Sequence, residues 1–476
     1  MRTDPREGET RSKRRVVLAV RIVTAAISLA LVALAWYDNP AMGGGENFGW
    51  FQAALFTVGI VVGAFCFAPL AWNARALTLL VSVLLTLAAA EFVLRFALGP
   101  QFYGIYRLDD HVLYRLIPGA QRVNTLPPIN DSLRIRYEIN SRGFRGKELA
   151  PLGESLRVVV YGDSFIQGDF SQTEDTFTVR LKAHLESQMG KSVEVVNAGV
   201  AGYGPDQELR RMEDELPILK PNLVIVAIYA GNDFGDLVRN KLYRLSSDGS
   251  LHQNQSVALQ DSFARDAARA RSEPILRKML RNARNRLFGD PNQIYPTGRE
   301  ARHGRIEDDL TQAASEYRQY VVEGDNVVHE LYRDPYNADV SLAPRSESAR
   351  YKIAMMEQII ARMHLTAASQ HMPLLFVLIP SPIDVADVHE TGEVDPMKYP
   401  AYRRSVLTDI LDQICRRNQL PAVNLFGPFW EHRANELFLK GGDDHWNTRG
   451  QDFAAELVSN YVTAQGLLRA ETIGTP

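Results

Sequence analysis

The chain has 476 residues, a formal net charge of -3 and a pI near 6.4. This charge balance gives no reason to expect nucleic-acid binding, and the length allows two or three domains. The two cysteines, Cys66 and Cys415, fall in separate predicted helices, so we expect no disulfide between them.

The first hundred residues are unusually apolar. A basic tail at 1–15 precedes three apolar segments at about 16–36, 51–72 and 76–98. Each is close to the ~20 residues that a helix needs to cross a bilayer. Glu91 and Arg95 in the third segment are spaced to pair with each other on one helix face. A buried hairpin of a soluble protein is the alternative, but three successive segments favour membrane spans.

Charges beside these segments predict their orientation. Lys and Arg cluster before the first segment, whereas the loop at 37–49 has two acidic residues and no basic one. The positive-inside rule then places the N-terminus in the cytoplasm. We therefore expect a multi-pass protein of a bacterial inner membrane, with everything after Leu98 on the periplasmic side. If 16–35 were instead a cleaved signal peptide, the other two spans would leave the large domain on that same side.

Residues 99–150 indicate a connector, and an α/β domain is expected over 151–470. Apolar strand-type runs alternate there with helical patterns, which predicts a parallel sheet with helices on both faces. The expected strands are Arg157–Tyr161, Val193–Asn197, Leu223–Tyr229, Leu374–Ile379 and Ala422–Phe426, and the expected helices are Thr176–Met189, Gln207–Leu216, Glu347–Gln370, Arg403–Arg416 and Thr448–Ala464.

A mostly helical insertion at about 240–345 follows the third strand. Within it, Pro274–Phe288 has the pattern of a basic amphipathic helix. Such a helix either lies on an anionic membrane surface or packs its apolar stripe on the domain. Both interpretations stay open.

Four polar blocks follow expected strands or precede the last helix. They are Gly162-Asp163-Ser164, the glycine-rich run from Asn197 to Gly204, Gly231-Asn232-Asp233, and Asp443-Asp444-His445-Trp446-Asn447. In a parallel sheet these loops lie at one edge. A serine with a histidine base and amide donors for an oxyanion is what acyl transfer needs. We expect Asp163, Asp233 and Asn197 to brace loops, and Trp446 either to stack on a sugar or to pack in the core.

The four blocks, in this order, resemble the SGNH (GDSL-type) hydrolase superfamily, and in particular its membrane-anchored bacterial branch. The resemblance implies a flavodoxin-like three-layer sandwich with a central parallel sheet of about five strands. It also implies that Ser164 is the nucleophile and His445 the base, with the Ser164 amide, Gly202 and Asn232 forming the oxyanion hole. The acid that orients His445 is expected to be Asp443, with the adjacent Asp444 as the alternative, because the family's commoner spacing would require an acid where Gly442 stands.

The resemblance further implies a serine esterase that acts on acyl esters, above all O-acetyl esters, of cell-surface or secreted polysaccharide. Its expected partners are an acylated carbohydrate or other ester, the membrane, and proteins of polysaccharide biosynthesis. A polysaccharide O-acetyltransferase, a lipid esterase and a non-catalytic assembly protein are the alternatives. No cofactor, metal or nucleic acid is expected, since the histidines lack metal-ligand spacing.

Overall fold

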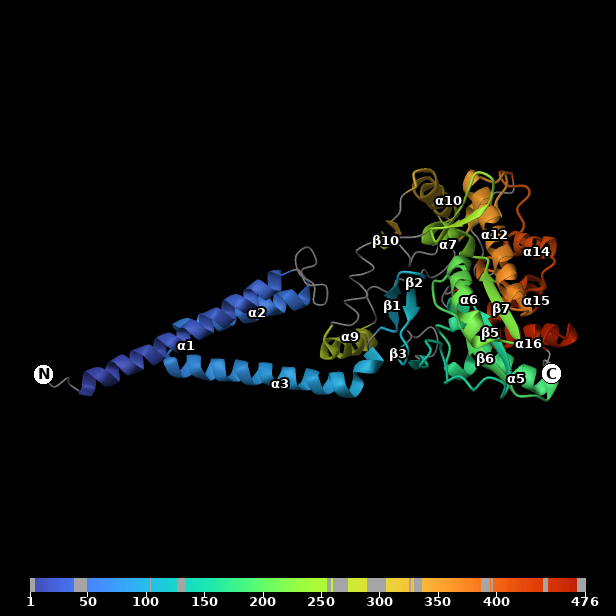
Figure 1. Cartoon of the computed structure of the whole chain (residues 1–476). Coiled ribbons are helices and arrows are strands. Elements are labelled where there is room, and N and C mark those ends of the chain that lie inside the picture. Colours follow the sequence, from blue (N-terminus) through green and yellow to red (C-terminus); the bar gives the residue numbers. More distant parts are fainter. Residues whose placement is uncertain are drawn as a thin grey trace. The chain divides into compact units, whose positions relative to one another are not determined.

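The computed structural model describes residues 5–37, 49–102, 104–125, 134–254, 258–259, 273–288, 305–324, 327–328, 336–386, 394, 397–439 and 444–468. The chain forms two compact units (Figure 1). Unit 1 comprises Met1–Tyr103 and Ala264–Pro291, and unit 2 comprises Gly104–Phe263 and Asn292–Pro476.

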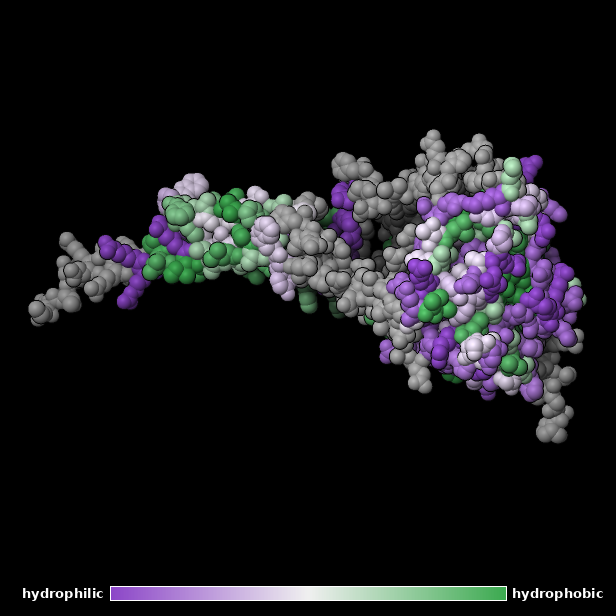
Figure 2. Space-filling model, turned by 90° about the horizontal axis from the view of Figure 1, so that it is seen from above, coloured by the Kyte–Doolittle hydropathy of each residue, from purple (hydrophilic) through white to green (hydrophobic). Residues whose placement is uncertain are grey.

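Unit 1 is built on the helices α1 (Pro5–Trp36), α2 (Trp50–Ala64) and α3 (Leu70–Phe102). Their outer faces carry exposed apolar side chains, with Leu29 70% and Phe96 88% exposed. Figure 2 shows these helices largely in green, the colour of hydrophobic residues. Residues 14–36 of α1 and 70–98 of α3 are long and apolar enough to cross a bilayer, by length and composition alone.

The boundary between the second and third apolar segments differs from the prediction. Instead of a helix through Trp72, α2 ends at Ala64, a 3₁₀ turn covers Phe65–Phe67, and α3 begins at Leu70. Pro69 explains the break, because proline has no N–H to donate within a helix and is tolerated only near a helix start. Arg75, which lies between the second and third predicted segments, is therefore helical, and the continuous apolar helix at 52–67 is shorter than a typical span.

The basic amphipathic helix predicted in the insertion is α9 (Ile275–Phe288), and it belongs to unit 1, where it packs against α3. The Glu91 carboxylate accepts hydrogen bonds from the backbone N–H groups of Ile275 at 2.9 Å and Leu276 at 3.1 Å. Arg95 donates to the same carboxylate at 2.6 Å, as the helical spacing predicted. Glu91 thus caps the N-terminus of α9.

Unit 2 contains the predicted five-stranded parallel sheet. Its strands are β5 (Leu156–Tyr161), β6 (Val193–Asn197), β7 (Leu223–Tyr229), β12 (Leu374–Ile379) and β13 (Ala422–Asn424). They are arranged in the order β13-β12-β7-β5-β6, and all neighbours are parallel. This is the flavodoxin-like strand order, in which the winding direction reverses beside the first strand, here between β5 and β7.

Helices cover both faces of the sheet, which gives three layers (Figure 1). Side chains of β5 alternate between two cores: Val158 and Val160 lie in one, and Val159 and Tyr161 in the other. The first core is closed by α5 (Phe177–Met189) and α16 (Thr448–Ala464), and the second by α6 (Pro205–Leu219), α12 (Glu347–Ser369) and α14 (Val406–Arg417). The fold class is therefore as predicted.

Two short antiparallel hairpins occupy the connector, β1 (Tyr106–Asp109) with β2 (Leu113–Leu116) and β3 (Gln121–Thr125) with β4 (Arg134–Glu138). They pack on the sheet unit: the Tyr114 hydroxyl donates to the Ala201 carbonyl at 2.8 Å, and the Gln207 side chain donates to Val112 at 2.8 Å.

The insertion is helical only in part. It is preceded by α7 (Asp233–Asn240). Its described elements are the hairpin β8 (Tyr243–Leu245) and β9 (Leu251–Gln253), the parallel pair β10 (Ala258–Leu259) and β11 (Val327–Val328), α9, α10 (Arg305–Glu316) continued by a π-helix at Tyr317–Val322, and α11 (Ala338–Ser341). The remaining elements are α4 (Ser164–Gln167), α13 (Pro382–Val385), α15 (Phe426–Glu431) and single 3₁₀ turns at Thr173–Asp175 and Ala434–Glu436.

Candidate active site

The strand order brings two of the polar blocks together. Ser164 follows β5 directly, Asn232 follows β7, and these two strands are neighbours in the sheet. Ligands of open α/β sheets bind at the carboxyl ends of the strands where the winding reverses, and that point here lies between β5 and β7. The topology therefore places a serine and an amide side chain at the expected ligand-binding edge.

Ser164 is held at the start of the short helix α4. The preceding Asp163 caps this helix, because its Oδ1 accepts a hydrogen bond from the Phe165 N–H at 2.9 Å. The Ser164 N–H is one of the first donors of α4, and such donors have no partner within the helix. Asp163 braces the loop, as expected, and the hydroxyl of Ser164 remains for chemistry.

His445 reaches Ser164 from the other end of the chain. Its Nε2 lies 2.7 Å from the Ser164 Oγ, which is hydrogen-bond distance. The loop that carries His445 is fixed on both sides, since the Leu439 N–H donates to the His445 carbonyl at 2.9 Å and Phe438 pairs with Trp446 in a β-bridge. The structure thus brings together the two residues that the sequence predicted as nucleophile and base, and those roles stay a prediction.

Aromatic rings set the plane of the imidazole. The Phe165 ring stacks on His445 with centroids 5.2 Å apart, and the Phe170 ring lies at 4.6 Å. Trp446 is fully buried against Phe165 and Phe429, so its role is packing and not sugar stacking.

Among the described residues, the carboxylate beside the His445 ring is that of Asp444. Its Oδ1 lies 3.3 Å from the His445 Nδ1, and its Oδ2 accepts a hydrogen bond from the Tyr229 hydroxyl at 3.0 Å. Burial, followed by the Asp444 charge, raises the pKa of Tyr229 well above its usual range, so Tyr229 stays a neutral donor. Asp443, the residue preferred from the sequence, lies outside the described residues.

The predicted oxyanion donors stand in three loops at the same edge. Asn232 is only 7% exposed and begins α7 without capping it through its side chain. Its Oδ1 has no hydrogen-bond partner among the described residues. Gly202 has a φ of +73°, a conformation that favours glycine. The oxyanion role of Gly202, Asn232 and the Ser164 amide stays a prediction.

Two side chains hold the glycine-rich loop against α4. Asn197 donates to the Ile166 carbonyl at 2.7 Å and accepts from the Gly199 N–H at 3.1 Å, so it braces the loop as expected. Gln167 accepts from the Ala201 N–H at 2.7 Å. An ideal Cβ on Gly199 would come within 2.3 Å of the Gln167 backbone nitrogen, so only glycine fits this contact.

Arg145 is a supporting residue that the sequence did not reveal. Its guanidinium donates to the backbone carbonyls of Gln167, Gly168 and Ser171, and it stacks on the Tyr137 ring at 4.3 Å. It thereby fixes the segment that leads out of the nucleophile helix. The sequence gives no local signal for this role, since the partners of Arg145 lie more than twenty residues further along the chain.

Two buried carboxyl groups, those of Asp233 and Glu208, lie close enough to Asp163 to interact with its charge. Asp233 accepts the Tyr229 N–H at 2.7 Å and so braces the loop after β7, as expected. Burial, followed by the neighbouring Asp163 charge, raises the pKa of both Asp233 and Glu208 well above the usual range. A protonated carboxyl at these positions avoids a cluster of buried negative charges. No group of three or more metal-ligating side chains occurs among the described residues.

Comparison with known proteins finds neighbours among solved structures. A lipase/acylhydrolase from Enterococcus faecalis is 12% identical, covers 65% of this chain and 96% of its own, and has a TM-score of 0.31. A GDSL-like lipase from Bacteroides thetaiotaomicron is 14% identical, with 67% and 93% covered and a TM-score of 0.30. The acetyl xylan esterase AlAXEase is 11% identical, with 64% and 99% covered and a TM-score of 0.31. No family model and no curated protein matches the sequence.

Proposed function

We propose that this protein is a membrane-anchored serine esterase that removes acyl groups, in particular acetyl groups, from polysaccharide on the periplasmic side of a bacterial membrane. The observation that carries the proposal is the 2.7 Å contact between the His445 Nε2 and the Ser164 Oγ at the carboxyl edge of the sheet. Histidine at this distance can accept the serine proton as the hydroxyl attacks an ester.

The reaction needs two steps. The Ser164 Oγ attacks the ester carbonyl and its proton passes to the His445 Nε2, while amide donors from Ser164, Gly202 and Asn232 hold the oxyanion. The intermediate collapses as the C–O bond to the sugar breaks and His445 returns the proton to the leaving sugar hydroxyl. Water then attacks the acyl-enzyme and gives a proton to His445. The acyl C–Oγ bond breaks, His445 returns that proton to the Ser164 Oγ, and the free acid leaves.

Membrane anchoring is part of the proposal and has separate support. Two described helices in unit 1 have the length and composition of spans, and their outer faces are apolar. The charge asymmetry around them favours a periplasmic sheet unit.

The test uses the full-length protein in detergent. We expect hydrolysis of p-nitrophenyl acetate and release of acetate from acetylated xylan, and we expect Ser164→Ala to lower kcat by at least about a thousandfold. Ser369→Ala, at an exposed serine near the end of α12, is the matched control and should retain full activity.

The competing functions give different results in the same assay. Faster cleavage of octanoate than of acetate esters would indicate a lipid esterase. Acetyl transfer to an added oligosaccharide, faster than hydrolysis, would indicate an acetyltransferase. Activity that survives Ser164→Ala would contradict the whole mechanism.

A further inference from the structure

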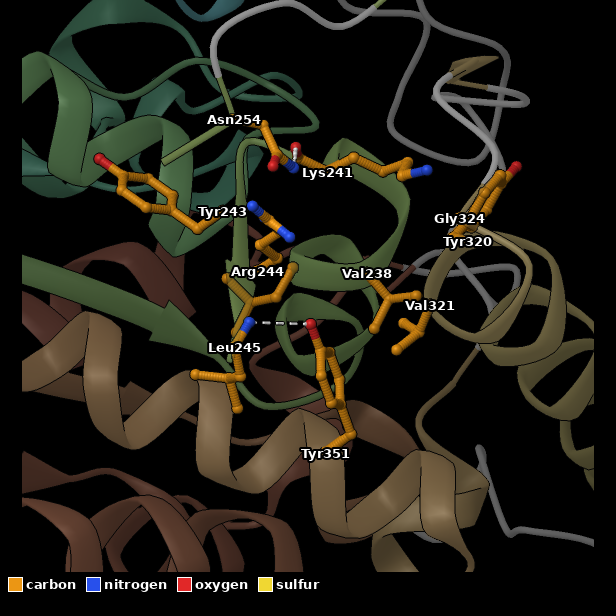
Figure 3. Close-up of a pocket in the computed structure, with 11 residues that line it drawn as sticks. Val238, Lys241, Tyr243, Arg244, Leu245, Asn254, Tyr320, Val321, Gly324 and Tyr351 are labelled. Carbon is orange, nitrogen blue, oxygen red and sulfur yellow. Dashed lines mark hydrogen bonds between the residues drawn. The ribbon is translucent and has the colours of Figure 1, made fainter. Parts of the chain in front are cut away.

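The proposed reaction at Ser164 gives no role to one cavity and one helix of the described residues. The cavity, of about 470 Å³, lies in unit 2 beside the β8–β9 hairpin, where the Leu245 N–H donates to the Tyr351 hydroxyl at 3.2 Å (Figure 3). Its lining mixes apolar, aromatic and basic side chains and does not single out one class of ligand. The helix is α9, and its charge and position together indicate one kind of partner.

The segment of unit 1 that carries α9 is strongly basic. Ala264–Pro291 contains eight arginine or lysine residues and three acidic residues, a net charge of +5, in a chain whose net charge is -3. Ion pairs within the segment, such as those of Glu273 with Arg277 and Arg281, are already included in this balance. The excess of positive charge therefore does not depend on any one cation being unpaired, and it attracts an anionic surface.

The contact with α3 places α9 at the border of the proposed span. The stretch of α3 from Leu70 to Ala90 has a length of about 31 Å, which matches a hydrocarbon thickness of about 30 Å. The next residue is Glu91, whose carboxylate accepts the first backbone N–H groups of α9. The N-terminus of α9 is therefore fixed where the hydrocarbon gives way to the headgroups, beside the C-terminal part of α3 (Figure 1).

The side chains near this border are those of a membrane interface. On α9, Ile275 is buried, whereas Leu280 is 58% exposed and Arg281 is also exposed. On the neighbouring part of α3, Phe92 is 74% and Phe96 is 88% exposed. A helix that presents both leucine and arginine at its surface can lie in the interface, with the leucine among acyl chains and the arginine at the headgroups.

We propose that α9 is an interfacial helix that binds the headgroups of anionic phospholipids beside α3. The Glu91 contact holds the helix at headgroup depth, and its arginines bind the lipid phosphates through charge-assisted hydrogen bonds. The inference shares the proposed membrane anchoring with the proposed function, but lipid binding itself needs no reaction at Ser164.

The experiment measures lipid binding to the full-length protein in detergent by native mass spectrometry. The probes are dioleoyl phosphatidylglycerol, which is anionic, and dioleoyl phosphatidylcholine, which is zwitterionic and has the same acyl chains. We expect phosphatidylglycerol to bind at least about tenfold more tightly than phosphatidylcholine. Arg281→Gln combined with Arg284→Gln should weaken phosphatidylglycerol binding by about twentyfold, since each basic residue near an anionic surface contributes on the order of fivefold.

Two further double variants separate the charge of α9 from its folding and from the net charge of the protein. Arg281→Lys with Arg284→Lys keeps both charges and should bind phosphatidylglycerol as the wild type does. Lys182→Gln with Lys191→Gln removes two charges from exposed positions of unit 2 and should leave the binding unchanged.

Equal affinity for the two lipids would overturn the proposal, and so would phosphatidylglycerol binding that survives Arg281→Gln with Arg284→Gln. A loss of the same size in the lysine double variant or in the unit 2 control would also overturn it, because the effect would then not come from the charge of α9. Failure of the esterase proposal is seen separately, as lack of Ser164-dependent hydrolysis by the wild-type protein.

Discussion

At the scale of single residues, the His445 ring lies at the end of a chain of contacts that starts in the sheet. Tyr229, the last residue of β7, donates to Asp444, and Asp444 lies beside the Nδ1 of His445. The Asp444 side chain is 49% exposed, whereas that of His445 is 18% exposed. Water therefore screens the Asp444 charge, and we expect its contribution to the proposed catalysis to be smaller than that of a buried triad acid.

We expect Asp444→Asn to lower kcat by about tenfold to a hundredfold with little change in KM, because Asn keeps the size of the side chain and loses its charge. Asp443→Asn is the matched comparison, since Asp443 is the other acid beside His445 in the sequence. Steady-state kinetics on an acetyl ester decide between them: a larger loss for Asp443→Asn would assign the orienting role to Asp443.

The sequence was sufficient to single out Ser164 and His445, which the structure places in contact, and insufficient for the residues that support them. Ser164 and His445 were predictable because each stands in a short local pattern beside an element boundary. Tyr229 and Arg145 were not, since Tyr229 reads as the end of an apolar strand and the partners of Arg145 are distant in the chain. Asn232 and Gly202 lie in loops at the predicted edge of the sheet, but their role as oxyanion donors beside Ser164 stays a prediction.

At the scale of elements, the glycine-rich loop after β6 and the nucleophile helix α4 depend on close backbone contact. Gly199 allows this contact, since a Cβ there would lie 2.3 Å from the Gln167 nitrogen and 2.7 Å from the Ile166 carbonyl carbon. Backbone atoms cannot move aside as a flexible side chain can. The contact is therefore a condition for packing the glycine-rich loop against α4.

Gly199→Ala should destabilise the protein by about 1–3 kcal/mol and lower esterase activity, because α4 and the loop must separate. Gly427→Ala is the control: it lies in α15, and its added Cβ meets nothing within 4 Å. Urea unfolding and esterase activity measured on both variants check the prediction. Equal stability of the two would contradict it.

Element boundaries were predicted less well than element types. Hydropathy alone extended the second apolar segment to Trp72, and Pro69 ended it earlier. The last strand was predicted to reach Phe426, but β13 ends at Asn424 because Leu425 caps α15. The insertion was expected to be mostly helical, and the β8–β9 hairpin was missed since its strands are only three residues long.

At the scale of the whole molecule, the sheet unit buries several acids. Asp384 is 1% exposed and accepts a hydrogen bond from the Tyr336 hydroxyl at 2.7 Å. Burial raises its pKa from 3.8 to about 7, and burial raises the pKa of Asp206 to about 6. In this range the folded protein keeps protons that the unfolded chain has released.

The free energy of unfolding should therefore fall as pH rises from about 4 to about 7, since the unfolded state binds fewer protons than the folded state there. Asp384→Asn keeps an acceptor for Tyr336 and removes the titration of this side chain. The free energy of unfolding of the variant should therefore fall less over this pH range than that of the wild type, with a difference of up to a few kcal/mol. Urea unfolding of the full-length protein at several pH values tests this, with Asp110→Asn at an exposed site as control. Identical slopes for Asp384→Asn and wild type would contradict the prediction.

The chain passes between its two units three times, after residues 103, 263 and 291. A protease that cuts only the first of these connections, after residue 103, does not free the sheet unit. The segment 264–291 would still retain it, because α9 is fastened to α3 through Glu91 and Arg95. Shedding of the sheet unit from its N-terminal helices thus requires both a cut and the undocking of α9, and the Glu91 cap acts as a second, non-covalent tether.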